Sequence, residues 1–126
     1  EVITTERLPD LAGAARERLA SLGCSNVVVR LAGDVLGCPE EAPFDAIVVA
    51  AAAPHLPKVL LDQLADGGRM VIPVGSLHQQ ELHSVQKDHD GYSVTSLGPC
   101  RFVPLIGLGA WGEDDTRGFP NGPVFV

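Results

Sequence analysis

The chain is poor in basic residues and has no long apolar run. Lys and Arg total 9 against 16 Asp and Glu, giving a formal net charge of -7 over 126 residues. The basic residues are scattered, which argues against a protein that binds nucleic acid through phosphates. No apolar stretch reaches the roughly 18 residues that a membrane-spanning helix needs, so we expect no membrane segment.

Cysteine usage excludes a disulfide framework. The three cysteines, Cys24, Cys38 and Cys100, form no C-x-x-C pair. An odd number of unpaired, small thiols is typical of a reducing compartment. The first residues also lack the basic start and apolar segment of a signal peptide. We therefore expect a cytoplasmic protein.

Metal-ligand spacing is also lacking. His78 and His83 are five residues apart on extended chain and would face opposite sides, while His55 and His89 fall in predicted loops. The acidic run 113–115 has no flanking ligands of the kind a cation site requires. We expect no metal site, and we interpret these residues as structural or solvated.

The apolar residues that are present alternate between strand and helix patterns. Residues 2–5 read as a strand, and Pro9 opens a helix with apolar residues at helical spacing that ends near Gly23. Residues 26–32 and 45–51 are nearly continuous apolar runs, which indicates strands buried on both faces. A second helix follows Pro57, a turn is expected at 66–68, and a strand at 69–74.

After residue 80 the pattern changes to weak alternation. Residues 81–87 and 92–97 flank an Asp-His-Asp-Gly turn, which predicts an antiparallel hairpin at a sheet edge. We expect an α/β fold, Rossmann-like and doubly wound, with a mostly parallel sheet and a C-terminal antiparallel hairpin. Residues 107–126 are rich in Gly and Pro and are predicted to be an irregular tail, in which Trp111 and Phe119 cap an exposed core edge.

Polar residues at strand ends mark a candidate ligand site. Glu6 closes the first strand and Asp34 follows the second, after Gly33, so both carboxylates should face one crevice at the carboxyl edge of a parallel sheet. Each has an ordinary alternative. Glu6 would otherwise be a solvated acid at a helix N-terminus, and Asp34 a loop residue in an Asx turn. Asp45 begins its strand and is interpreted as structural.

An ordered set of short motifs resembles the protein-L-isoaspartate O-methyltransferase family. The most specific blocks are Ile-Pro-Val-Gly at 72–75 and Arg-Phe-Val-Pro-Leu at 101–105. The other matching blocks are Thr-Glu-Arg-Leu-Pro-Asp-Leu-Ala at 5–12, Gly-Asp at 33–34, Phe-Asp-Ala-Ile-Val-Val at 44–49, Ala-Ala-Ala-Pro at 51–54, Gln-Leu at 63–64, Gly-Gly-Arg at 67–69 and Gln-Glu-Leu at 80–82. The resemblance implies that residues 1–106 are the C-terminal part of a class I methyltransferase domain.

The resemblance also implies a function. Family members transfer a methyl group from S-adenosylmethionine to the carboxylate of an isoaspartyl residue in damaged protein, and some relatives modify aspartate in ribosomal peptides. By this resemblance the cofactor-binding residues are Glu6 and Arg7 together with Gly33, Asp34 and Val35. Glu6 would take the ribose hydroxyls, Asp34 the adenine amine, and the Val35 N–H a ring nitrogen. No catalytic residue is expected, because an ionised carboxylate attacking a sulfonium methyl needs no general base.

The substrate is expected at the end of the third strand. Small residues there would let a peptide backbone approach, and we predict backbone contacts from Ala52 and Ala53, beside Pro54. The partner would be a protein or peptide with an isoaspartyl or aspartyl carboxylate. Two alternatives stay open: a non-catalytic binding module of the same fold, and a methyltransferase that acts on another peptide or a small molecule.

The chain departs from the family pattern at three places. The family's glycine-rich cofactor loop would lie before Glu1, its Gly-Asp-Gly is Gly33-Asp34-Val35 here, and Ile106 stands where threonine is usual. We expect the chain to be inactive alone, with part of its apolar strands uncovered. We also expect that an N-terminal segment of a longer polypeptide, or a second chain, completes its sheet.

Overall fold

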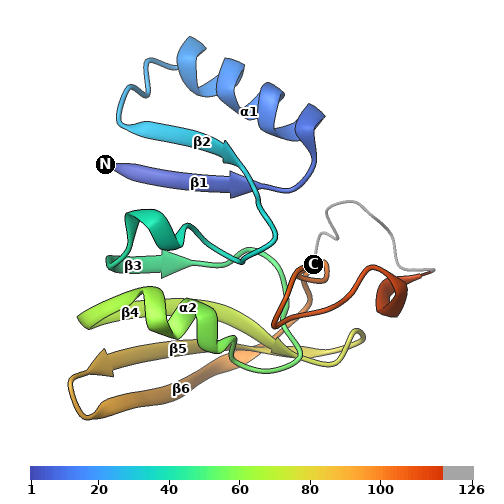
Figure 1. The fold of residues 1–126 in the computed structure, drawn as a ribbon. Coiled ribbons are helices and arrows are strands. Elements are labelled where there is room, and N and C mark those ends of the chain that lie inside the picture. The colour runs from blue at the N-terminus through green and yellow to red at the C-terminus, as the bar shows by residue number, and fades with distance from the viewer. Residues whose placement is uncertain (118–126) are drawn as a thin grey trace.

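The computed structural model describes residues 1–117 and alternates strands with helices in its first half (Figure 1). The elements are β1 (Val2–Glu6), α1 (Pro9–Ser21), β2 (Val27–Leu31), the 3-10 helix η1 (Pro39–Glu41), β3 (Phe44–Val48), α2 (Lys58–Gln63), β4 (Leu64–Gly75), β5 (Gln80–Asp88), β6 (Gly91–Cys100) and the 3-10 helix η2 (Asp114–Thr116). The predicted α/β class and the order of its elements are confirmed.

The first sheet contains two parallel strands joined by α1. β1 pairs with β2 in register from Val2 opposite Val27 to Glu6 opposite Leu31. Pro9 is the first residue of α1, where its lack of an N–H costs no hydrogen bond. Beyond the helix, Gly23 takes φ +74°, a left-handed conformation in which a residue without Cβ is favoured.

The second sheet has the order β3-β4-β5-β6. β3 is parallel to β4, whereas β4, β5 and β6 form antiparallel ladders. The predicted hairpin is confirmed and is longer than expected, since β6 continues to Cys100. In Figure 1, β1, β2 and β3 run in the same direction, as a parallel arrangement requires.

The link from α2 to β4 differs from the prediction. The helix ends at Gln63, and β4 begins at once with Leu64. The expected turn at 66–68 lies instead within β4, as an irregularity opposite the step from Phe44 to Ala46 of β3. Gly67, at φ +81°, allows this bulge because it carries no Cβ.

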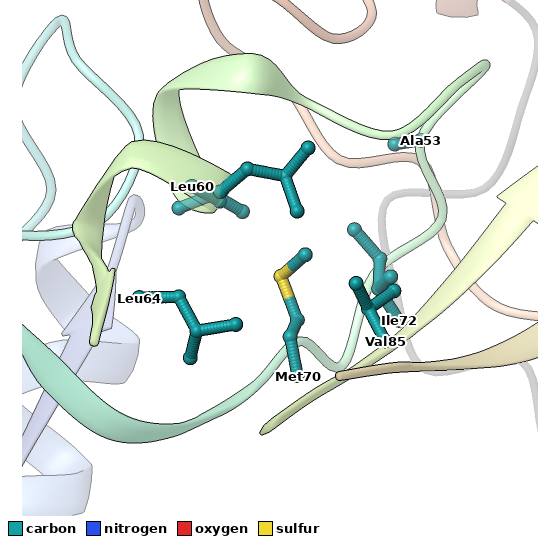
Figure 2. Close-up of a cluster of buried hydrophobic side chains, with 7 residues drawn as sticks. Ala53, Leu60, Leu64, Met70, Ile72 and Val85 are labelled. Carbon is teal, nitrogen blue, oxygen red and sulfur yellow. The ribbon is translucent and has the colours of Figure 1, made fainter. Parts of the chain in front are cut away.

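The core lies between α2 and the second sheet (Figure 2). Leu60 and Leu64 come from the α2 side and face Met70, with Ile72 and Val85 beside it. The members of this cluster are all buried: Ala53, Leu60, Leu61, Leu64, Met70, Ile72 and Val85. Apolar burial is the largest stabilising contribution available to the fold, so the second sheet holds most of it.

Four strands, β1, β2, β3 and β6, have an open edge among residues 1–117. β1 pairs only with β2, and β3 pairs only with β4. Val48 of β3 is 82% exposed and Val28 of β2 is 38% exposed. The prediction of strands buried on both faces is therefore wrong for this chain by itself, and the prediction that part of their surface lacks cover is confirmed. The strands form two sheets rather than one because nothing in the described chain joins β1 to β3.

Candidate functional site

The carboxyl ends of β1 and β2 lie together. Ala32 donates its backbone N–H to the Glu6 carbonyl at 2.8 Å, and Glu6 is opposite Leu31 in the ladder. The chain then enters the loop that begins with Gly33 and Asp34. Glu6 and Asp34 thus follow neighbouring parallel strands at the same edge of the sheet, where ligands of open α/β sheets bind.

The Glu6 carboxylate already has one partner. Its Oε1 accepts a hydrogen bond from the Leu8 backbone N–H at 3.0 Å, which satisfies a donor at the start of α1. The side chain is half-buried. The second carboxylate oxygen keeps its acceptor capacity, so the helix-terminal role and a ligand role are compatible. The ribose contact itself stays a prediction.

Arg7 points to the tail. Its Nη1 lies 3.1 Å from Oε1 of Glu113, and both side chains are exposed. This pair links the β1–α1 turn to residues over a hundred positions further along the chain. Contact between Arg7 and a cofactor also stays a prediction.

A pocket of about 300 Å³ lies at the end of β2. Three of the predicted cofactor-binding residues line it: Gly33, Asp34 and Val35. Its remaining lining residues are Thr5, Arg30, Leu31, Gly37, Cys38, Pro39 and Glu40. An apolar wall with a few converging polar groups is the usual form of a small-molecule site. The pocket's volume lies at the lower end of the range for small-molecule sites.

One rim of this pocket contains ion pairs that the sequence analysis did not predict. Arg30 pairs through Nη2 with Glu41 at 2.6 Å and through Nη1 with Glu40 at 3.5 Å. Cys38 donates its thiol to Glu40 Oε1 at 3.2 Å. The signal was present, since Arg30 is the single charged residue of β2, and the acids follow in η1.

The thiol and its carboxylate acceptor shift in opposite directions. Burial raises the pKa of Cys38, and its bond to Glu40 adds to the rise. The pKa of Glu40 is lowered by a hydrogen bond from its own backbone N–H and by the Cys38 thiol. Cys38 is therefore a protonated, buried group in this rim and not an activated nucleophile.

The predicted substrate segment is fully engaged in backbone hydrogen bonds. Ala52 donates to the Val103 carbonyl at 2.7 Å and accepts from the Leu105 N–H at 2.8 Å. Ala53 donates to Pro73 at 3.0 Å and accepts from Gly75 at 2.9 Å. Both alanines are buried.

These bonds narrow the substrate prediction. Neither alanine N–H is available to a peptide, because each already donates inside the protein. What stays of the prediction is a contact to the second lone pair of the Ala52 or Ala53 carbonyl, or to the half-buried Pro54.

The described part of the tail returns to the site. Val35 forms a parallel bridge with Leu108, and Ile106 forms one with Trp111. Leu105 and Ala110 pack against the core cluster, and capping of a core edge by Trp111 stays a prediction. The sequence indicated no such contact with the pocket loop, because residues 107–117 have no periodicity. Phe119 and the rest of the predicted tail lie outside the described residues.

Residues 1–117 contain no group of three His, Cys, Asp or Glu side chains arranged to hold a metal ion. No helix in the same range has the length and apolar character to cross a bilayer.

Comparison with known proteins places this geometry in a family. The family model described as protein-L-isoaspartate(D-aspartate) O-methyltransferase matches residues 1–109. The chain belongs to this family. It is 50% identical over 110 residues to protein-L-isoaspartate O-methyltransferase 1 of Syntrophobacter fumaroxidans, covering 87% of this chain and 51% of that protein. It is 49% identical over 117 residues to the Methanopyrus kandleri protein of that name, covering 91% and 52%. The chain thus spans about half the length of the curated relatives it matches.

Solved structures agree on the fold. One is a Plasmodium falciparum protein described as a protein-L-isoaspartate O-methyltransferase in complex with S-adenosyl-L-homocysteine. It superposes with a TM-score of 0.70 at 29% identity, over 82% of this chain and 51% of that one. A second protein-L-isoaspartate O-methyltransferase superposes with a TM-score of 0.74 at 24% identity, over 83% and 34%, and supports the fold alone.

Proposed function

We propose that this chain forms the C-terminal part of an S-adenosylmethionine-dependent enzyme that methylates isoaspartyl carboxylates in damaged proteins. The observation that carries the proposal is the pairing of β1 with β2, which puts Glu6 and the pocket of Asp34 at one sheet edge. Membership of the family and the S-adenosyl-L-homocysteine complex of the Plasmodium relative support the same ligand.

The pocket fits the adenine end of that cofactor. Asp34 is an acceptor for an exocyclic amine, and the Val35 backbone N–H is a donor for a ring nitrogen, with the Val35 and Leu31 side chains as apolar lining. Gly33 leaves the loop without a side chain at its first position. Glu6, at the end of β1, would accept from the ribose hydroxyls, and Arg7 lies next to it at the turn.

S-adenosylmethionine, when bound, supplies a methyl group on a sulfonium that a carboxylate oxygen can accept directly in line. The protein therefore has to align the carboxylate oxygen with the methyl group and to exclude water from both. It does not have to remove a proton. Four backbone hydrogen bonds fix the buried Ala52–Ala53 segment in place. Because the reaction removes no proton, no catalytic acid or base is assigned among the proposed site residues.

We further infer that activity requires a strand between β1 and β3, together with a glycine-rich loop for the methionine part of the cofactor. Both strands have an open edge in the described chain, and Val48 is left exposed beside one of them. The chain also spans only about half of its relatives. The strand would come from a preceding segment of a longer polypeptide or from a second chain.

We propose a cytoplasmic setting on the basis of the thiols. Cys24, Cys38 and Cys100 are all free. Free thiols persist in a reducing compartment, which supports the cytoplasm as the place where this protein acts.

One assay tests the function. This chain is prepared alone and joined to a family segment that carries the glycine-rich loop, and labelled S-adenosylmethionine is offered with an isoaspartyl peptide. The joined protein is expected to label the isoaspartyl peptide and not its matched aspartyl form. The chain alone is expected to label neither peptide. Light scattering records the mass of each.

Three results would count against parts of the proposal. A monomeric chain that labels the peptide by itself would contradict the need for a further strand. Equal labelling of both peptides would contradict isoaspartyl selectivity and favour an enzyme acting on aspartate. A joined protein that binds the cofactor and labels neither peptide would favour a binding module or another acceptor.

A further inference from the structure

A buried glutamine stands directly behind the pocket loop. Gln63 is the last residue of α2 and is only 4% exposed. A buried amide without partners is costly, and its placement therefore indicates what it bonds to. Gln63 belongs to the second sheet's helix, yet it contacts the loop that follows β2 of the first sheet.

The Gln63 amide uses its carbonyl and both of its N–H groups. Oε1 accepts from the Cys38 backbone N–H at 2.8 Å. Nε2 donates to the Leu36 carbonyl at 2.8 Å and to the Val59 carbonyl at 3.0 Å. Two of the three bonds thus clamp the loop backbone on either side of Gly37, while the third fixes the amide to its own helix.

Gly37 shows how closely the loop approaches. It has φ +78°, and a Cβ built on it would lie 2.3 Å from Gln63 Oε1 and 3.0 Å from a Leu60 methyl carbon. No side chain fits between the loop and the amide. The clamp begins one residue after Val35 and two after Asp34, the residues that face the pocket.

We propose that Gln63 is a positioning residue for adenine selection. By fixing Leu36 and Cys38, it keeps the Asp34 carboxylate and the Val35 N–H at the spacing that matches an exocyclic amine and its neighbouring ring nitrogen. This proposal rests on the proposed function, because it assigns the pocket to adenine. The selected feature is the amine: a base with a carbonyl there, as in hypoxanthine, sets an acceptor against the Asp34 carboxylate.

The test measures base preference and stability side by side. The probes are S-adenosylhomocysteine and S-inosylhomocysteine, titrated by calorimetry into the joined protein. The variants are Gln63→Met, which removes the amide at similar volume, and Gly37→Ala. The methyl group of Gly37→Ala would push the loop backbone away from the Gln63 amide. Gln80→Met is the matched control, since Gln80 is 2% exposed and bonds to Ser76 and Phe102, away from this loop.

The expected result separates positioning from stability. The parent should prefer the adenosyl probe by about 10- to 100-fold, the value of one charge-assisted hydrogen bond. Gln63→Met and Gly37→Ala should each reduce that preference to about threefold or less, mainly because they weaken the binding of the adenosyl probe. Gln80→Met should lower the melting temperature as much as Gln63→Met does and keep the parent's preference.

Two outcomes would overturn the inference. If Gln63→Met and Gly37→Ala lose stability but keep the parent's preference, Gln63 is only a structural residue, and the proposed function is untouched. If the parent itself does not distinguish the probes, the adenine assignment of the pocket fails, and this inference fails with it. Gly37→Ala keeps the test decisive where Gln63→Met does not fold.

Discussion

The segment from β1 to β2 and the segment from β3 to β6 are built from similar apolar strands, but only the second encloses a core. In the first, the buried apolar residues of the strands and helix are Ala12 and Val29. In the second, seven buried residues form one cluster between α2 and the sheet (Figure 2). The two segments also differ in pairing, since the first has one ladder and the second has three.

The difference follows from what each strand has beside it. β4 lies between two neighbours and under α2, so alternate residues such as Met70 and Ile72 are fully covered. β1 has one neighbour, and Val2 at its start is 50% exposed. Parallel strands with apolar side chains on both faces are stable when both faces and both edges are covered. The first segment therefore leaves more of its apolar side chains uncovered than the second.

The largest expected effect comes from the core of the second segment. Ile72→Ala removes a fully buried side chain and should lower the free energy of unfolding by about 2–5 kcal/mol. Val2→Ala, in the first segment, should change it by less than about 0.5 kcal/mol. Urea denaturation of the two variants measures both. Equal losses would show that the two segments are covered alike.

A middle-sized effect should appear only when the open edge is filled. Val48 is 82% exposed, so Val48→Ala should be nearly neutral in this chain. In the joined protein the same change should cost about 1.5 kcal/mol, as two methyl groups leave a covered site. Urea denaturation of the parent and the Val48→Ala variant, in the chain alone and in the joined protein, measures both differences. A neutral result in the joined protein would mean that β3 is not covered there.

The smallest effect concerns the contact between Arg7 and the tail. The pair between Arg7 and Glu113 is exposed, with the Glu113 side chain at 76%. Glu113→Gln should destabilise the chain by about 0.2–1 kcal/mol at low salt and by less at high salt. Thermal melts at two ionic strengths measure the difference. A loss that does not change with salt would rule out an ion pair as its cause.

Local patterns were enough to predict the order of strands and helices. The apolar runs, Pro9 and the Asp-Gly turn each specify a nearby structure, and all of them appear where expected. The burial of residues 26–32 and 45–51 was predicted less well. Runs of Val and Ile indicate a strand whose faces can be buried. Whether they are buried depends on neighbouring elements that are far away in the sequence.

The site was predicted in part for the same reason. The shared sheet edge of Glu6 and Asp34 was predictable because the strand ends of a parallel sheet converge by a general rule, whereas their contacts to a cofactor stay predictions. Gln63 was not found, since it reaches its loop from 25 to 27 residues away and no local pattern marks that distance. The sequence predicts backbone contacts from Ala52 and Ala53 to a peptide, but the backbone of this segment is paired inside the protein. It is engaged because the segments around Pro73 and Val103 come to lie on either side of it.

The most direct test of the account is the affinity of Glu6 and Asp34 variants for the cofactor. Calorimetry with S-adenosylmethionine is carried out on the joined protein and on its Glu6→Ala and Asp34→Ala variants. Each variant should lose about 1.5–3 kcal/mol of binding free energy, because each removes one charge-assisted hydrogen bond. Asp45→Ala, on an exposed acid at the opposite end of its strand, should leave the affinity unchanged. Unchanged affinity in both the Glu6 and Asp34 variants would contradict a cofactor site at the shared edge of β1 and β2.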